Sequence, residues 1–185
     1  MKNTYVTSYF PLVSILLFSL SFAMLVEVHL FKFLNATGIY VGMLEFFSRS
    51  GIKLALLILL LVAFFMVFAA LKLIADTINE LSLLFFSKDF NGESLKNVRA
   101  GAIIYFTGSI LSLLGSAHVT ILASVFLITT ISYFVFFVYK VSSKLSLSGI
   151  IGLIFFQVLT WSTLVLGVLF IALKVYNSIV ASLPV

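Results

Sequence analysis

Few residues in this sequence are of types that carry out chemistry. The chain has two His, six Asp or Glu and no Cys. Four of the ionisable side chains are expected near the same membrane face: Glu27, His29, Glu45 and His118. Carboxylate and imidazole groups bind Zn²⁺ and exchange protons, so these four residues form a candidate proton- or metal-responsive cluster. Their spacing matches no compact ligand motif, and the plainer interpretation of Glu27 and His29 is the interfacial end of a helix.

The sequence lacks the motifs of well-known enzyme classes. It contains no GxxxxGK[ST] phosphate loop and no HExxH, GxSxG or GxGxxG motif. The lack of Cys excludes thiolate catalysis, disulfide bonds and iron–sulfur clusters. We therefore expect no enzymatic activity, no metal and no cofactor, with a membrane enzyme of unrecognised type as the remaining enzymatic alternative.

A second polar group lies within the last apolar segment. Gln157 and Trp161 are four residues apart and therefore neighbours on a helix, and Thr160 and Thr163 lie at a similar depth. Trp normally prefers membrane interfaces, yet Trp161 is at the centre of residues 149–173. These side chains either hydrogen-bond between helices or line a midplane cavity for a small solute or ion. The interhelical contact is the plainer interpretation.

Small residues recur at helical spacing in two apolar segments. Side chains of this size on one face of a helix let a neighbouring helix approach closely. The residues concerned are Gly101, Gly108, Ser112 and Gly115 in one segment, and Gly149, Gly152 and Gly167 in the last. The pattern predicts a packing seam on each of the two helices.

The composition places these residues in a membrane protein. Apolar residues make up 63% of the chain and charged residues 9%, against roughly 45–50% and about 25% in soluble domains. These figures exclude a soluble enzyme, a disordered tail, a disulfide scaffold and a nucleic-acid module. The net charge of +5 comes from residues between apolar blocks. Such charges set topology and contact lipid headgroups, so the lipid bilayer is the first expected partner.

The apolar blocks predict an all-α, polytopic integral membrane protein with five transmembrane helices, forming one membrane domain over residues 1–185. A spanning helix needs roughly 20 apolar residues. Residues 100–139 contain no Asp, Glu, Lys or Arg and are too long for one span, so we expect a turn at 115–118. The predicted spans are residues 10–30, 53–75, 100–116, 119–139 and 149–173.

The two longer connections are each expected to hold an interfacial segment. Residues 39–47 are apolar except for Glu45 but too short to span, so they predict an interfacial or partly re-entrant piece. In residues 76–99, apolar side chains at helical spacing predict that the second helix continues along the inner membrane surface. Asn91-Gly92 is expected to turn the chain back.

The basic residues predict the orientation. Positive residues are enriched on the cytoplasmic side of membrane proteins. With a cytoplasmic N-terminus, seven of the eleven basic residues lie inside: Lys2, Lys72, Lys88, Lys96, Arg99, Lys140 and Lys144. The other four lie outside: Lys32, Arg49, Lys53 and Lys174. We therefore predict a cytoplasmic N-terminus and an outer C-terminus.

Four stretches resemble a known family. They are YFPL at residues 9–12, GMLEFF at 42–47, SGIKL at 50–54 and LKNVRAG at 95–101. These stretches are similar to the YufK-type small membrane proteins, which have about this length and occur in endospore-forming Gram-positive bacteria. The resemblance covers the whole chain and implies a location in the bacterial cell membrane. It implies no established activity and supplies no site residues.

The sequence therefore predicts a non-enzymatic, multi-pass membrane component. It is expected to act through helix packing, lipid contact or a partner, which is either a second copy of the chain or another membrane protein. The alternative is a small-solute or ion permease, or a subunit of one, with a midplane site on the fifth helix.

Overall fold

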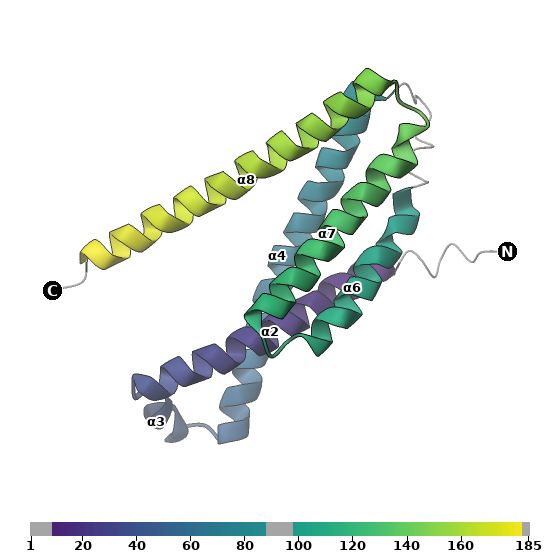
Figure 1. Ribbon diagram of the computed structural model, residues 1–185. Coiled ribbons are helices and arrows are strands. Elements are labelled where there is room, and N and C mark those ends of the chain that lie inside the picture. The colour runs from purple at the N-terminus through teal and green to yellow at the C-terminus, as the bar shows by residue number, and fades with distance from the viewer. Residues whose placement is uncertain (1–8, 88–97, 183–185) are drawn as a thin grey trace.

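The computed structural model describes residues 9–87 and 98–182, and the turn expected at Asn91-Gly92 lies outside them. The described residues contain helices and no β-strand (Figure 1). The elements are α2 (Phe10–Ala36), α3 (Ile39–Leu44), α4 (Arg49–Phe86), the 3₁₀ turn η1 (Arg99–Gly101), α6 (Ala102–Leu114), α7 (Val119–Ser142) and α8 (Leu147–Ser182). The predicted all-helical class is confirmed.

Helix α2 begins where Pro11 lies in its first turn, a position at which the missing N–H removes no helical hydrogen bond. It buries three serines, Ser14, Ser19 and Ser21, and each hydroxyl donates to the carbonyl four residues earlier in the same helix. The helix ends at Ala36, six residues beyond the predicted end of the span. Gly38, at φ 74°, then turns the chain into α3.

Helix α4 is one continuous element of 38 residues. Ser48 caps its start, where the side-chain oxygen accepts a hydrogen bond from the Gly51 N–H at 3.2 Å. At 1.5 Å per residue the helix is about 57 Å long, nearly twice the hydrocarbon core of a bilayer. The second predicted span and the helical part of the connection after it therefore form one helix.

Helices α6 and α7 form a hairpin, with the chain reversing at the predicted residues 115–118. The His118 N–H donates to the Gly115 carbonyl at 3.1 Å within this turn. Four helices in the described part of the chain are long and apolar enough to cross a membrane: α2, α4, α7 and α8. The segment Arg99–Leu114, which comprises η1 and α6, is apolar but shorter than these four. Four of the five predicted spans therefore lie in helices that are long enough to cross a membrane.

Helix α2 packs against both α4 and α6. Where α2, α4 and α7 meet, an aromatic cluster fills the space between them, with ring centroids 5.3–6.4 Å apart. Its members are Phe18, Phe22, Phe64, Phe68 and Phe126. A second core lies near the C-terminal end of α4, where Leu83 packs with Phe137, Val141 and Leu153.

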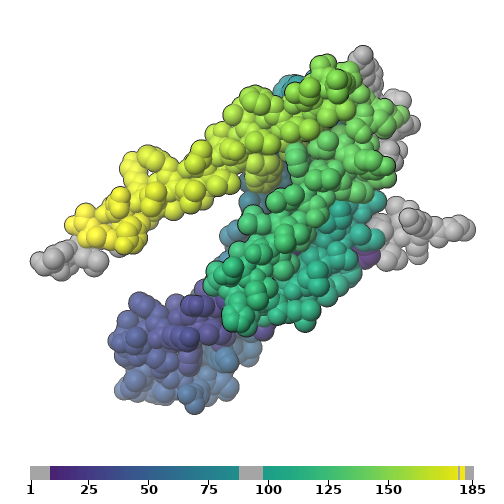
Figure 2. Space-filling model, in the orientation of Figure 1, coloured from purple at the N-terminus to yellow at the C-terminus, as the bar shows by residue number. Residues whose placement is uncertain are grey.

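Helix α8 leaves this bundle part of the way along its length. Its first turns pack on the end of α4, through Leu153, Phe156 and Gln157. From Ser162 to Ala181, every side chain that the structure describes is exposed. Figures 1 and 2 show this half of α8 separated from the other helices.

Candidate functional site

The four ionisable residues predicted at one membrane face have different environments. Glu27 is buried, with 6% of its surface exposed, and its Oε1 atom has no hydrogen-bond partner. His29, Glu45 and His118 are exposed, and the His29 Nδ1 atom lies 2.9 Å from the Leu25 carbonyl oxygen. Among residues 9–87 and 98–182, no three His, Cys, Asp or Glu residues converge to hold a metal ion. The geometry singles out Glu27 from the set.

Gln157 forms a buried polar contact between two helices. Its Nε2 atom donates to the Asn79 Oδ1 atom at 2.8 Å and to the Ser82 hydroxyl at 3.3 Å. The Ser82 hydroxyl in turn donates to the Asn79 backbone carbonyl at 2.8 Å. Gln157 is 2% exposed, Asn79 8% and Ser82 0%. Because the amide is enclosed and bonded by α4, it joins α4 to α8 and does not face a cavity.

The other residues of the predicted midplane group lie at the edge of this contact. Thr160 and Trp161 are half-buried. Thr163 is exposed, and its hydroxyl donates to the Leu159 carbonyl of its own helix at 2.9 Å. Trp161 lines a shallow surface hollow formed by α8 alone. The structure therefore separates Gln157, which is enclosed, from residues that face outward.

The glycines of α6 and of the turns before and after it lie against α7. A Cβ atom added at Gly101 would be 2.8 Å from the Tyr133 ring, and one at Gly115 would be 2.8 Å from Ile121 Cγ2. One added at Gly108 would overlap the Thr129 hydroxyl. These distances are shorter than the roughly 3.5–4.0 Å of an ordinary carbon contact. Only glycine permits this approach of α6 to α7.

Ser112 contacts a different helix from these glycines. Its hydroxyl oxygen lies 2.8 Å from the hydroxyl oxygen of Ser21 on α2, where either residue can be the donor, and 2.7 Å from the Ser109 carbonyl oxygen of its own helix. Both hydroxyl-bearing residues are fully buried. The predicted stripe on this segment therefore serves two interfaces, one with α7 and one with α2.

The glycines of α8 differ in whether α4 lies against them. A Cβ atom at Gly149 would lie 3.0 Å from the Phe86 carbonyl oxygen, and one at Gly152 would lie 2.5 Å from the Phe86 ring. At Gly167, an added Cβ would have no atom within 4 Å. Gly149 and Gly152 thus allow α8 to approach α4. Gly167 lies in the exposed part of α8, residues 162–181, which we call the open half of α8.

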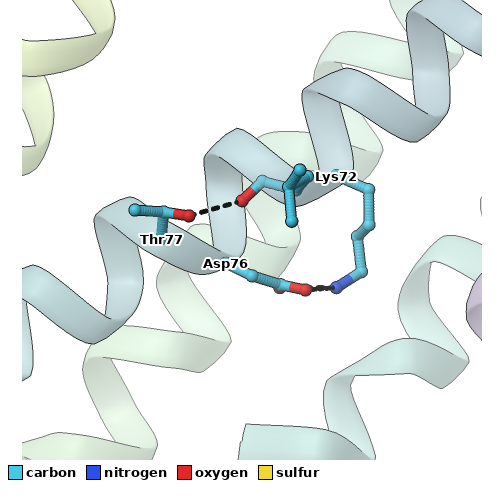
Figure 3. Close-up of polar contacts among 4 residues, drawn as sticks. Lys72, Asp76 and Thr77 are labelled. Carbon is cyan, nitrogen blue, oxygen red and sulfur yellow. Dashed lines mark hydrogen bonds and ion pairs between the residues drawn. The ribbon is translucent and has the colours of Figure 1, made fainter.

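The ion pair of Lys72 with Asp76 on α4 was not predicted from the sequence. Lys72 bonds to the Asp76 carboxylate one turn later (Figure 3). Their i, i+4 spacing was the available sequence signal. Because the two charged side chains remain 35% and 46% exposed, the pair contributes little stability, roughly 0–1 kcal/mol.

Comparison with known proteins supplies a family but no activity. Residues 27–184 match the family described as "Family of unknown function (DUF5366)". The chain is 50% identical over its full 185 residues to the "Uncharacterized membrane protein YufK" of Bacillus subtilis (strain 168), and the match covers all of both chains. No solved structure matches the chain.

Proposed function

We propose a function for this chain, which belongs to the DUF5366 family of unknown function and resembles a bacterial membrane protein along its whole length. The chain is a non-enzymatic component of the bacterial cell membrane that acts by packing α8 against a partner protein in the bilayer. The observation that carries this proposal is the open half of α8.

The face of α8 that contacts α4 continues into the open half. At 100° per residue, Leu153 and Thr160 share a direction with Gly167 and Ile171. The first part of this face packs closely on α4, while Gly167 has free space around it. Small residues on a membrane helix favour close approach of another helix. A partner helix that extends the existing contact would cover this face.

The buried polar groups support a packing role over a permease role. The amide of Gln157 is bonded to Asn79 and Ser82, and the hydroxyl oxygens of Ser21 on α2 and Ser112 on α6 lie 2.8 Å apart. These groups hold helices together and present no polar surface to a solute. This arrangement removes Gln157 as support for a midplane solute site on α8.

Photo-crosslinking in intact bacterial membranes tests the partner proposal. A photoreactive amino acid is placed at Gly167 or Ile171 on the continued face, and at Leu169 on the opposite face as the matched control. We expect one discrete protein adduct from the continued face and none from position 169. An adduct at twice the mass of the chain identifies a second copy, and another mass identifies a different partner. Lipid adducts alone, or equal protein adducts from both faces, would refute the proposal.

We also propose that α6 with η1 forms a fifth span and that the N-terminus is cytoplasmic. The segment Arg99–Leu114 is apolar and is placed between α2 and α7, which supports a crossing short of the usual length. The absence of Cys makes a labelling test direct. In intact cells, an impermeant maleimide should label Thr37→Cys and spare Ser143→Cys until the membrane is opened. The opposite labelling pattern would reverse the orientation, and labelling of both from outside would remove the fifth span.

A further inference from the structure

Glu27 is a buried acid without a partner inside the helix bundle. It lies on α2 and is 94% enclosed by the protein, with Oε1 completely covered and accepting no hydrogen bond. Burying an ionised carboxylate without a counter-charge costs far more than burying a neutral polar group. An enclosed, unpaired carboxyl oxygen of this kind needs either a cation or a proton.

The charged and titratable groups near this end of the bundle do not neutralise Glu27. Glu27 takes no part in the ion pair of Lys72 with Asp76. The candidates are His29 and Lys32 on α2, Glu45 after α3, Arg49 and Lys53 on α4, and His118 before α7. All six are exposed, and the Arg49 guanidinium donates to the Tyr40 hydroxyl. Helix α6 carries no Asp, Glu, Lys, Arg or His.

The surroundings of Glu27 favour a proton over a metal cation. Ca²⁺ and Mg²⁺ require about six or more oxygen ligands, and Zn²⁺ requires about four ligands. The described residues offer no group of three or more His, Cys, Asp or Glu side chains that could hold a metal ion. A proton requires no further ligand, because it forms a covalent O–H bond with the carboxylate itself. We propose that Glu27 is a proton-binding site. Its carboxyl group carries the proton, as the neutral acid, when the helices are packed.

The neutral acid has a specific chemical reaction that tests this proposal. The O–H of a carboxylic acid adds across one C=N bond of dicyclohexylcarbodiimide, so that the proton moves to nitrogen and the carboxyl oxygen bonds to the central carbon. The acyl group then migrates to nitrogen and leaves a stable N-acylurea. No atom is lost and nothing is oxidised or reduced. The labelled protein therefore gains the mass of one whole carbodiimide. The reagent is apolar and reaches groups that water-soluble carbodiimides do not.

The experiment uses the full chain in phosphatidylcholine vesicles, with peptide mapping by mass spectrometry. We expect one adduct, on Glu27, whose yield falls as the pH is raised because only the acid form reacts. Glu27→Gln should abolish the label, and Glu45→Gln, which removes an exposed carboxylate, should leave it unchanged. An unlabelled Glu27, or a label that persists in Glu27→Gln, would overturn the proposal.

Infrared spectroscopy provides a second measurement that does not depend on access of a reagent. The wild type at neutral pH should show the carbonyl stretch of a neutral carboxylic acid, and Glu27→Gln should lack that band. Because Gln has the shape of the neutral acid and no charge, this variant should retain the thermal stability of the wild type within a few degrees. A wild-type spectrum containing only carboxylate bands would exclude an occupied proton site.

Discussion

Gly108 provides the sharpest test of how α6 and α7 pack. Replacing it with Ala adds one Cβ atom, which would lie 2.6 Å from Thr129 Cγ2 and 2.9 Å from Thr129 Cβ. Thr129 cannot rotate freely out of the way, since it is β-branched and its hydroxyl donates to the Val125 carbonyl at 2.7 Å. The two helices must therefore separate. Overpacking of this kind typically costs about 1–3 kcal/mol, and the better helix propensity of Ala recovers about 0.5–1 kcal/mol. We expect a net loss of about 1–2 kcal/mol in the free energy of unfolding.

The assay is reversible unfolding in mixed detergent micelles, followed by circular dichroism. Gly167→Ala is the matched control, because the same change is made on a helix where the new atom meets nothing within 4 Å. That control should be neutral or slightly stabilising. Adding Thr129→Ala to Gly108→Ala removes the two nearest colliding atoms and should restore part of the loss, giving a measurable coupling in a double-mutant cycle. Equal stabilities for Gly108→Ala and Gly167→Ala, or strict additivity in the cycle, would refute this account of the seam.

Three further measurements probe the interhelical contacts and α8. Gln157→Leu should lower the unfolding free energy by about 1–3 kcal/mol because it leaves the side-chain oxygen Oδ1 of Asn79 buried without a donor. Thr163→Ala, at an exposed position, should be nearly neutral in the same detergent assay. Ser112→Ala should cost about 0.5–1.5 kcal/mol through loss of its contact with α2, and no change in melting temperature would contradict that contact. Trp161 should emit at short wavelength, resist iodide in the water phase and be quenched by brominated lipid chains, whereas strong iodide quenching would place water beside it.

The sequence was sufficient to predict the helical class and the hairpin turn, because both follow from lengths. An uncharged run of 40 residues is too long for one helix in a bilayer of fixed thickness, so the chain must reverse near its middle. The structure reverses it between Leu114 and Val119. Helix ends were less predictable, because apolar residues near a membrane surface are compatible with a longer helix. Helix α8 accordingly extends to Ser182, beyond the predicted residue 173.

The face of α4 that packs on α8 was not predictable from apolar spacing. Two of the apolar residues in this part of α4, Leu84 and Phe85, are 73% and 62% exposed. The side chains buried there include Asn79 and Ser82. In a bilayer, lipid is as apolar as a protein interior, so an apolar side chain gains little from facing inward. A polar side chain does gain, and Asn79 and Ser82 were the better signal for the contact.

The four predicted ionisable residues do not converge on one site among the described residues, and for Glu27 and His29 the reason is geometric. Glu27 and His29 are two residues apart, and side chains at that spacing do not face each other on a helix. The helix places Glu27 inward and His29 outward. The seam on α8 shows a similar limit. A repeat of small residues identifies a face that can be approached, but the neighbouring helix determines how much of that face is covered.

The two kinds of polar contact in this protein imply an order of membrane insertion. Ser14, Ser19 and Ser21 donate to carbonyls of their own helix, so α2 can enter the lipid alone with these groups already satisfied. Gln157 and Asn79 are 78 residues apart and depend on different helices. During synthesis, Asn79 emerges long before Gln157 and must wait in the membrane or at its surface with its side-chain amide unsatisfied. Release of the last helix from the insertion machinery is therefore the event that gives the Asn79 side chain on α4 its hydrogen-bond partner. A chain truncated before Gln157 should be a substrate for membrane quality control.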